Sequence, residues 1–320
     1  MSMHPLLRAL FSAWDWRLDV SVVLLTFAIL YTTGWWRLRR LGKRKLANRK
    51  RLVAYWGGLI TLAIALMSPV DPLGGQLFFM HMLQHMTTIM VSAPLLWLGA
   101  PFPFLLWGLP PTVRKWVGGL FAQGSPVHAG LQLITQPAFV WLMFIVVYAG
   151  WHDPNLYNLA LWHGWVHDIQ HLTFFATAML FWWSVIGAAP HINRPPIWGR
   201  LVMVVGVIPI NMAIGVVIAT SSEVLYSYYS SVPRIWGFTL LDDQSIAGVI
   251  MWTSGSEMLI LAIIFLIAGA MRGTDKKPPT PVIGWDRDEA MIAPGLEHRA
   301  LQNKWQRLKA ASLHPSSDGS

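Results

Sequence analysis

Two pairs of histidines, each with its members four residues apart, are the clearest candidates for chemistry in this sequence. His81 and His85 form the first pair, and His167 and His171 form the second. On an α-helix, residues at this spacing stack on one face about 6 Å apart along the axis, so both imidazoles of a pair can reach one metal ion. The pattern therefore predicts a site for a metal ion or a haem.

The choice of metal ligands is narrowed by the absence of cysteine. The 320 residues include no Cys, 11 His and 15 Met. This excludes disulfides, thiolate ligands, iron–sulfur clusters and covalently attached c-type haem, and leaves His, Asp, Glu and the Met thioether. Met82, Met86 and Met90 form a row beside the first histidine pair. Such a row suits monovalent copper, although methionines also fill membrane cores.

A helix start precedes the second pair. Asp153 followed by Pro154 is typical of an N-cap residue with proline at the first helical position. His163 lies one turn before His167 and extends the same stripe toward the membrane interface. Asp168 points away from this stripe, and we expect it to orient an imidazole through a hydrogen bond.

The elements that must position these residues are membrane-spanning helices. The hydrophobic residues make up 54% of the chain and the charged residues 12%, about half the charged share of a soluble domain. This composition excludes a soluble enzyme, a coiled coil and a disordered chain. We predict an all-α membrane protein, a seven-transmembrane helix bundle whose apolar segments match a 30 Å hydrocarbon layer. The predicted spans are residues 19–36, 52–68, 76–99, 134–151, 165–187, 200–220 and 245–271.

The basic residues predict the orientation of the bundle. Residues 37–51 (RLRRLGKRKLANRKR) follow the first span, and such a Lys/Arg-rich connection belongs in the cytoplasm. Seven spans then place the N-terminus outside and the C-terminus in the cytoplasm, with Arg8, Arg17 and Arg234 as the outer basic residues. The net charge of +9 is thus a topology signal that can also contact anionic membrane lipid, and it does not indicate nucleic-acid binding.

Three parts follow from these spans. Residues 1–18 form an outer N-terminal segment, and residues 19–271 form the transmembrane domain. Residues 272–320 are polar and rich in proline, which predicts a cytoplasmic, largely disordered tail. The first span is too long for a cleavable signal peptide and lacks a small-residue cleavage site.

The predicted topology brings the two histidine pairs to the same depth. The third and fifth spans both run from outside to inside, so their early turns can face each other. The last span also begins outside, at Asp242 and Asp243; we expect one to cap the helix and the other to neutralise a bound cation. Glu257 lies about 20 Å below Asp243 along the helix axis, as a paired structural carboxylate or part of a proton path.

Several stretches resemble the CtaG family of cytochrome c oxidase assembly factors. They are HMLQHMTTIMVSAPLLWLGAP at 81–101, WHDPNLYNLAL from 151, VHDIQHLTFFATAMLFWW at 166–183, LYSYYSSVPRIWGFTLLDDQSIAG at 225–248, and Met251-Trp252. The family continues that last pair with Pro-Gly-Gly, whereas this chain has Thr253-Ser254-Gly255, so the resemblance leaves Glu257 unexplained. His163 is an extra histidine of this sequence. The family pattern falls on His81, His85, His152, His167, His171, Asp243 and Gln244.

The resemblance implies a protein of the bacterial inner (plasma) membrane that supports cytochrome c oxidase biogenesis. His81, His85, His167 and His171 would hold copper in the outer half of the membrane, facing the periplasm, and His152 and Asp243 would complete or support the site. The implied partners are cytochrome c oxidase subunits and a periplasmic copper chaperone. Because no bond is made or broken, we expect no enzymatic activity.

Two other functions compete with this interpretation on the sequence alone, and a transporter also stays open, although no inverted repeat indicates one. In the first, the protein binds haem, with His85 and one histidine of the fifth span as axial ligands. In the second, it is an intramembrane zinc hydrolase with three histidines and a metal-activated water. A spectrum with a Soret band distinguishes the first, and hydrolysis of a lipid amide or ester the second.

Overall fold

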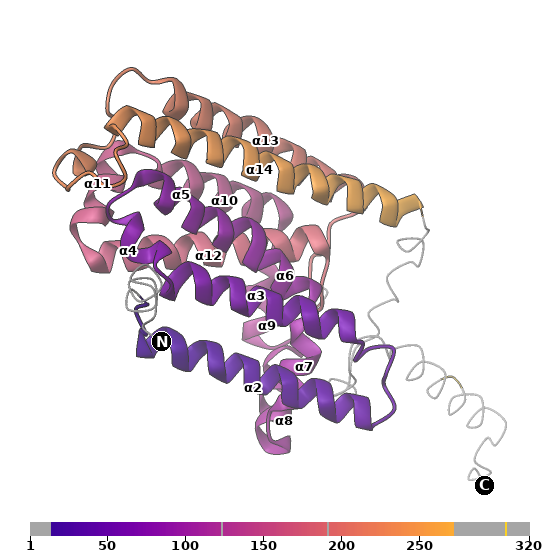
Figure 1. The fold of residues 1–320 in the computed structure, drawn as a ribbon. Coiled ribbons are helices and arrows are strands. Elements are labelled where there is room, and N and C mark those ends of the chain that lie inside the picture. Colours follow the sequence, from indigo (N-terminus) through magenta and orange to yellow (C-terminus); the bar gives the residue numbers. More distant parts are fainter. Residues whose placement is uncertain (1–13, 123, 191, 272–304, 306–320) are drawn as a thin grey trace, which may run out of the picture.

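The computed structural model describes residues 14–122, 124–190, 192–271 and 305, and the regular elements in this part of the chain are all helical (Figure 1). The predicted structures of residues 1–13 and of the tail, apart from position 305, lie outside the described residues. In chain order the helices are α2 (Leu18–Arg40), α3 (Arg49–Met67), α4 (Val70–Gly74), α5 (Phe78–Met86), the π-helical η1 (Thr87–Ser92), α6 (Ala93–Leu98), α7 (Pro101–Gly108), α8 (Pro111–Leu120), α9 (Pro126–Ile134), α10 (Pro137–Trp151), α11 (Pro154–Trp162), α12 (Gly164–Ile186), α13 (Ile197–Thr220), the 3-10 helix η2 (Ser227–Ser230) and α14 (Leu240–Met271).

The lengths and hydropathy of these helices make the chain a multi-span membrane protein. Five helices of the described part are long and apolar enough to cross a membrane by themselves: α2, α3, α12, α13 and α14. Two more candidates are bent pairs, Phe78–Leu98 with α7 at 67° and α9 with α10 at 62°. The helical membrane class is therefore confirmed, and the predicted seven spans result if each bent pair counts as one. The orientation of the termini stays a prediction.

Two boundaries differ from the predicted spans for identifiable reasons. The first helix continues to Arg40, because Arg37, Arg39 and Arg40 in its last turn lie at the negative end of the helix dipole. Asp153 does act as an N-cap, accepting hydrogen bonds from two backbone N–H groups, but the helix it caps is the separate α11. The fifth span itself starts at Gly164.

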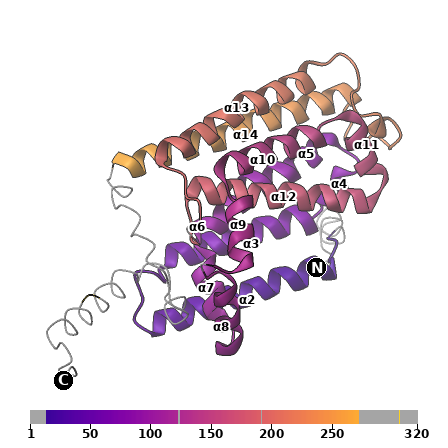
Figure 2. The ribbon, with the colours of Figure 1, turned by 180° about the vertical axis from the view of Figure 1, so that it is seen from behind.

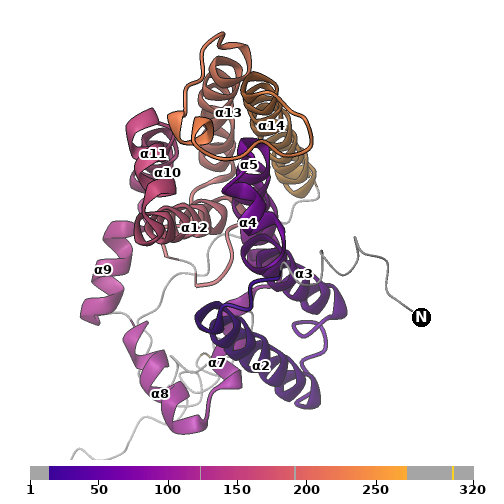
Figure 3. The same ribbon diagram turned by 60° about the vertical axis from the view of Figure 1, so that its left-hand side comes forward.

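The apolar side chains form two cores. The larger core joins α5, η1, α10, α12, α13 and α14, and the smaller joins α2, α3, α6 and α7. Figure 3 shows α13 and α14 at one side of the molecule and α2 and α7 at the other. Helix α8, which buries only Gly118, lies at the periphery (Figure 2). The histidine pairs lie on α5 and α12, which both belong to the larger core.

Helices α13 and α14 run side by side and lack space for larger side chains where they cross (Figures 1 and 2). A Cβ on Gly248 would lie 2.5 Å from the backbone nitrogen of Ala219, so glycine is required for this approach. The fully buried Asn211 donates from Nδ2 to the carbonyl of Met251 at 3.3 Å and accepts from the Tyr148 hydroxyl at 2.5 Å. A hydrogen bond between helices thus accounts for the polar residue in the predicted sixth span.

The third span is fastened to α12 by two indoles. Trp182 of α12 donates to the carbonyl of Ile89 in η1 at 2.8 Å, and Trp97 of α6 donates to the carbonyl of Met179 at 2.8 Å. A π-helical turn changes the direction of the side chains that follow it and frees backbone groups for other partners. These bonds therefore fix the rotation of the third span relative to α12.

Candidate metal centre

Four imidazole rings meet between α5 and α12. The ring centroids of His81 and His167 are 5.3 Å apart, and those of His85 and His171 are 4.7 Å apart. His81 and His85 are buried, while His167 and His171 are partly exposed. The structure thus brings the two pairs together, as the shared depth of the third and fifth spans predicts.

Within each helix the two imidazoles are hydrogen-bonded to each other. The Nε2 atoms of His81 and His85 are 2.6 Å apart, and those of His167 and His171 are 3.1 Å apart; in each pair one ring donates and the other accepts. Nδ1 of His85 and Nδ1 of His171 are buried and have no hydrogen-bond partner in the described part of the chain. A buried polar atom without a partner costs about 1–3 kcal/mol, so these atoms favour a ligand or a proton exchange within the cluster.

The chemistry of the donors suits a transition metal, but their spacing is that of hydrogen-bonded rings. Imidazole nitrogen binds copper, zinc and iron. Two nitrogens bound to one ion at about 2.0 Å in tetrahedral geometry stand farther apart than 2.6 Å. Accordingly, no group of three or more His, Asp or Glu side chains among the described residues is arranged to hold a metal ion. Metal binding at this cluster requires the paired Nε2 atoms to separate by rotation of the rings.

A fifth histidine lies next to the cluster. His152, at the end of α10, donates from Nδ1 to the carbonyl of Tyr148 at 2.6 Å, and its Nε2 is buried without a partner in the described part. Burial lowers the pKa of His152 to about 4, so the ring is neutral at physiological pH. Phe174 contacts the rings of both His152 and His85. His152 therefore has a free lone pair on the ring nitrogen that a metal would use.

The carboxylate of Asp243 binds two backbone N–H groups and the side chain of one arginine. Its carboxylate accepts from the backbone N–H groups of Phe78 at 3.0 Å and Phe79 at 2.9 Å, and from Arg234 at 2.9 Å. The side chain is 1% exposed. Asp243 therefore caps the N-terminus of α5, the helix that carries His81 and His85, and its charge is balanced by Arg234. Its predicted contact with a bound cation stays a prediction.

The neighbouring aspartate takes part in the hydrogen bonds at the start of α14. Asp242 accepts from the backbone N–H of Thr239 at 3.2 Å, and the Thr239 hydroxyl accepts from the Asp242 N–H at 3.1 Å. These reciprocal bonds form a capping box at the start of α14. Thr239 is thus the N-cap residue of the last helix, and Asp242, at the third helical position, completes the capping box.

Aromatic side chains cover the cluster on the side of α11 and η2. The ring of Tyr157 in α11 lies 5.1 Å from that of His81, and its hydroxyl is 3.2 Å from the hydroxyl of Tyr229. Tyr229 donates to the carbonyl of Gly74 at 3.0 Å. Tyr226 donates to the carbonyl of His152 at 3.0 Å. These bonds hold the connection between α13 and α14 over the N-terminal end of α5.

A half-buried carboxylate lies at the start of the third span. Gln84, between the two histidines of α5, donates to Asp71 at 2.6 Å and to the carbonyl of Ala65 at 2.9 Å. Burial raises the pKa of Asp71, while the hydrogen bond from Gln84 and the nearby His167 act to lower it. The Asp71 carboxyl group therefore lies close to the cluster.

Several residues singled out by the sequence lie elsewhere. Asp168 forms an ion pair with Arg17 at 2.8 Å, so the expectation that it orients an imidazole is wrong. His163 is exposed at the junction of α11 and α12, and Glu257 lies on α14 away from the histidines. The methionine row is buried in the larger core, where its members pack against apolar side chains: Met82, Met86 and Met90.

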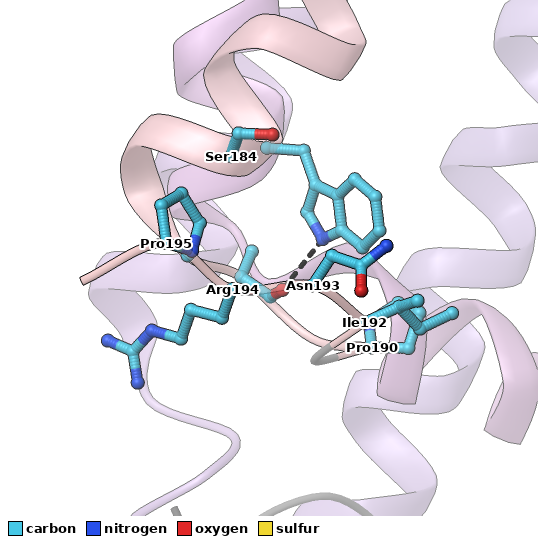
Figure 4. Close-up of a pocket in the computed structure, with 9 residues that line it drawn as sticks. Ser184, Pro190, Ile192, Asn193, Arg194 and Pro195 are labelled. Carbon is cyan, nitrogen blue, oxygen red and sulfur yellow. Dashed lines mark hydrogen bonds between the residues drawn. The ribbon is translucent and has the colours of Figure 1, made fainter. Parts of the chain in front are cut away.

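A separate small cavity lies at the opposite end of α12. Its volume is about 10 Å³, and its lining includes Ser184, Pro190, Ile192 and Asn193 (Figure 4). A cavity of this size holds about one water molecule. It does not extend the histidine cluster.

Sequence reasoning missed three neighbours of the cluster. Arg234 was predicted only to be an outer basic residue, and no feature of the sequence indicated its ion pair with Asp243. Tyr157 and Asp71 approach the histidines from α11 and α4, which lie outside the predicted spans. The available signal was Gln84, a polar residue between two histidines of an apolar segment, since such a group requires a buried partner.

The fold and the cluster define a class: multi-span helical membrane proteins with histidines gathered between two spans. The chain belongs to the cytochrome c oxidase caa3 assembly factor family (Caa3_CtaG), whose family model matches residues 29–273. This match covers the last six spans and part of the first.

Curated relatives include longer proteins from mycobacteria. An uncharacterised protein of Mycobacterium tuberculosis is 29% identical over 264 residues, which are 79% of this chain and 39% of that protein. An uncharacterised protein of Mycobacterium leprae is 28% identical over 273 residues, 82% of this chain and 40% of that protein. The chain thus spans about two fifths of the length of these relatives. No solved structure matches the chain significantly.

Proposed function

We propose that this protein supports the assembly of cytochrome c oxidase by binding copper as cargo at His81, His85, His167 and His171. The observation that carries the proposal is the meeting of four imidazoles from α5 and α12, with ring centroids 4.4–6.3 Å apart. Ionisable side chains inside a membrane are costly and mark functional sites. Membership of the assembly-factor family supports a metal-binding role for the cluster, because an oxidase must acquire its metals during assembly.

Unsatisfied nitrogens support a site for transient binding. Nδ1 of His85 and of His171 and Nε2 of His152 are buried without partners in the described part. The hydrogen bonds of the fold therefore leave these three ring nitrogens unused. The Nε2 atoms of each pair lie within hydrogen-bond distance of each other. Copper displaces these hydrogen bonds on arrival, and they re-form when it leaves. This exchange lowers the net gain on binding and suits a carrier.

The neighbouring groups have supporting roles in this proposal. Asp71 places a carboxyl group near His167, while Asp243 positions α5 through its cap. The protein makes and breaks no covalent bond, and its partners are cytochrome c oxidase subunits and a periplasmic copper chaperone. The site faces the periplasm if the basic connection 37–51 lies in the cytoplasm.

Copper content tests the proposal directly. Protein is purified in mild detergent from copper-supplemented cells, and metals and the absorption spectrum are measured. We expect His85→Ala and His171→Ala to lower copper affinity by at least about 10–100-fold, the range for loss of a supporting group at a metal site. Oxidase activity of cells carrying each variant should fall with it. His163→Ala is the matched control, because His163 is exposed on the same part of the chain.

The same measurement distinguishes the other functions. Wild-type copper content and normal oxidase activity in both alanine variants would overturn the copper site. A Soret band with stoichiometric haem would assign the histidines to haem, and stoichiometric zinc with hydrolysis of a lipid amide or ester would assign them to a hydrolase.

A further inference from the structure

A second candidate site lies at the C-terminal end of α2, remote from the histidines. A cavity of about 330 Å³ is lined by Trp35, Trp36, Arg39, Arg40 and Arg44. This volume is at the lower end of the roughly 300–1,000 Å³ of small-ligand sites. Three arginines and no carboxylate line it, so it attracts anions.

The arginines present hydrogen-bond donors to this cavity. The guanidinium of Arg40 stacks on the ring of Trp36 with its carbon 3.4 Å from the ring centroid. Stacking uses the face of the guanidinium and leaves the N–H groups at its edge free to bind a phosphate in bidentate fashion. Arg39 donates to the carbonyl of Ala47 at 3.0 Å, which holds the connection between α2 and α3 near the helix end. The cavity is therefore built from positioned side chains.

An apolar stripe leads to the cavity along α2. Val22, Leu25, Ile29 and Trp36 lie on one face of this helix, and their side chains are 61%, 61%, 63% and 49% exposed. Arg40 continues the same face at the end of the span. Exposed apolar residues followed by a tryptophan and an arginine match the depth profile of a phospholipid, with acyl chains in the core and phosphate at the interface. A free phosphate ion makes no use of such a stripe.

We propose that this cavity binds the headgroup phosphate of an anionic phospholipid whose acyl chains lie along α2. The arginines contact the phosphate, and Trp36 fixes the orientation of Arg40. The proposal is independent of the copper cargo. General attraction of basic residues to an anionic membrane surface does not require a cavity, so the test must separate the cavity from total charge.

Two triple variants with equal charge change make this separation. Purified protein is incubated with phosphatidylglycerol or phosphatidylcholine, and retained lipid is counted by native mass spectrometry after detergent removal. Arg39→Gln, Arg40→Gln and Arg44→Gln together should weaken phosphatidylglycerol binding about 100-fold, because the headgroup phosphate loses its charge-assisted hydrogen bonds in the cavity. Lys45→Gln, Arg49→Gln and Lys50→Gln remove the same charge from positions of the same connection that do not line the cavity, and should retain the lipid.

Further measurements separate the cavity from diffuse surface attraction and from a site for free phosphate. Trp36→Leu leaves the net charge unchanged and should also weaken phosphatidylglycerol retention, because Arg40 loses its stacking partner. Equal loss in both triple variants would overturn the cavity in favour of diffuse attraction. The assignment to an anionic phospholipid would be overturned if phosphatidylcholine were retained as well as phosphatidylglycerol. It would also be overturned if inorganic phosphate raised the unfolding temperature as much as phosphatidylglycerol does. Each variant is first checked for a wild-type unfolding temperature.

Discussion

Asp243 organises the histidine cluster through the backbone of α5. Its carboxylate accepts two backbone N–H groups at the start of α5 and one guanidinium N–H from Arg234. The acceptor belongs to α14, 165 positions away from Phe78 in the chain. Since His81 lies about one turn after Phe78, the cap sets the height of both histidines of α5 relative to α12. Asp243 is therefore a positioning residue.

The first prediction concerns this cap. In Asp243→Asn one oxygen remains, so a backbone N–H group of α5 faces an NH₂ group and Arg234 loses its ion pair. We expect the free energy of unfolding to fall by about 2 kcal/mol and copper affinity to fall about 10-fold. Thermal unfolding in detergent and a copper titration measure these effects. The control is Glu223→Gln, an exposed position in the connection between α13 and α14. It should change neither the free energy of unfolding nor the copper affinity. An unchanged copper affinity in Asp243→Asn would contradict the positioning role.

At the scale of elements, the third span consists of three consecutive helical segments that together position the histidines of α5. Helix α5 carries His81 and His85, the π-helical η1 follows, and α6 completes the span. The indoles of Trp182 and Trp97 join the last two segments to α12. The facing of the histidine pairs thus depends on hydrogen bonds made deeper in the bundle.

The second prediction tests that dependence. Trp182→Phe keeps an aromatic ring but removes the donor to the carbonyl of Ile89, a buried residue. Stability should decrease by about 1–2 kcal/mol, because a buried carbonyl loses its partner. Copper affinity should decrease as well, since the rotation of the third span is less constrained. The matched change Trp165→Phe affects a residue of α12 that is 67% exposed, and both measurements should stay at wild-type values. Equal behaviour of the two variants would mean that η1 does not support the site.

At the scale of the whole molecule, the helices divide into two cores that meet along the third span and α12. The smaller core includes α2 and its basic end, and the larger includes the histidine cluster. The histidines and the basic cavity lie at opposite ends of the spans. If the connection 37–51 lies in the cytoplasm, the cavity faces the cytoplasm and the histidines face the periplasm. Under the proposed function, the orientation decides which side of the membrane would supply the copper.

The third prediction concerns this orientation. The chain has no cysteine, so a single introduced thiol reports its own position without background. A membrane-impermeant maleimide should label Glu223→Cys in intact spheroplasts and Lys45→Cys only after lysis. Glu223 and Lys45 are both exposed, so access depends on the side of the membrane. The reverse labelling pattern would invert the topology and place the histidine cluster toward the cytoplasm.

The predictable part of the site comes from local periodicity. The spacing of His81 with His85 and of His167 with His171 places each pair on one helix face, because an α-helix turns once in 3.6 residues. Hydropathy located the long spans for the same local reason. Asp153-Pro154 identified a cap but not its helix, since α11 is too short to be told from the start of a span. Asp168 was misjudged because its partner, Arg17, lies 151 positions away.

The sequence by itself determined the membrane class, the approximate positions of the spans and the two histidine pairs that each share one helix face, since these follow from hydropathy and helical spacing. Only the tertiary structure decided which groups the polar side chains contact. It assigned Asp243 to the cap of α5, closed the imidazoles in hydrogen-bonded pairs, and gathered three arginines around a cavity beside two tryptophans. The physical reason is that a buried charge or hydrogen-bonding group takes whichever partner the packing of helices brings near, and that partner is not encoded by distance along the chain.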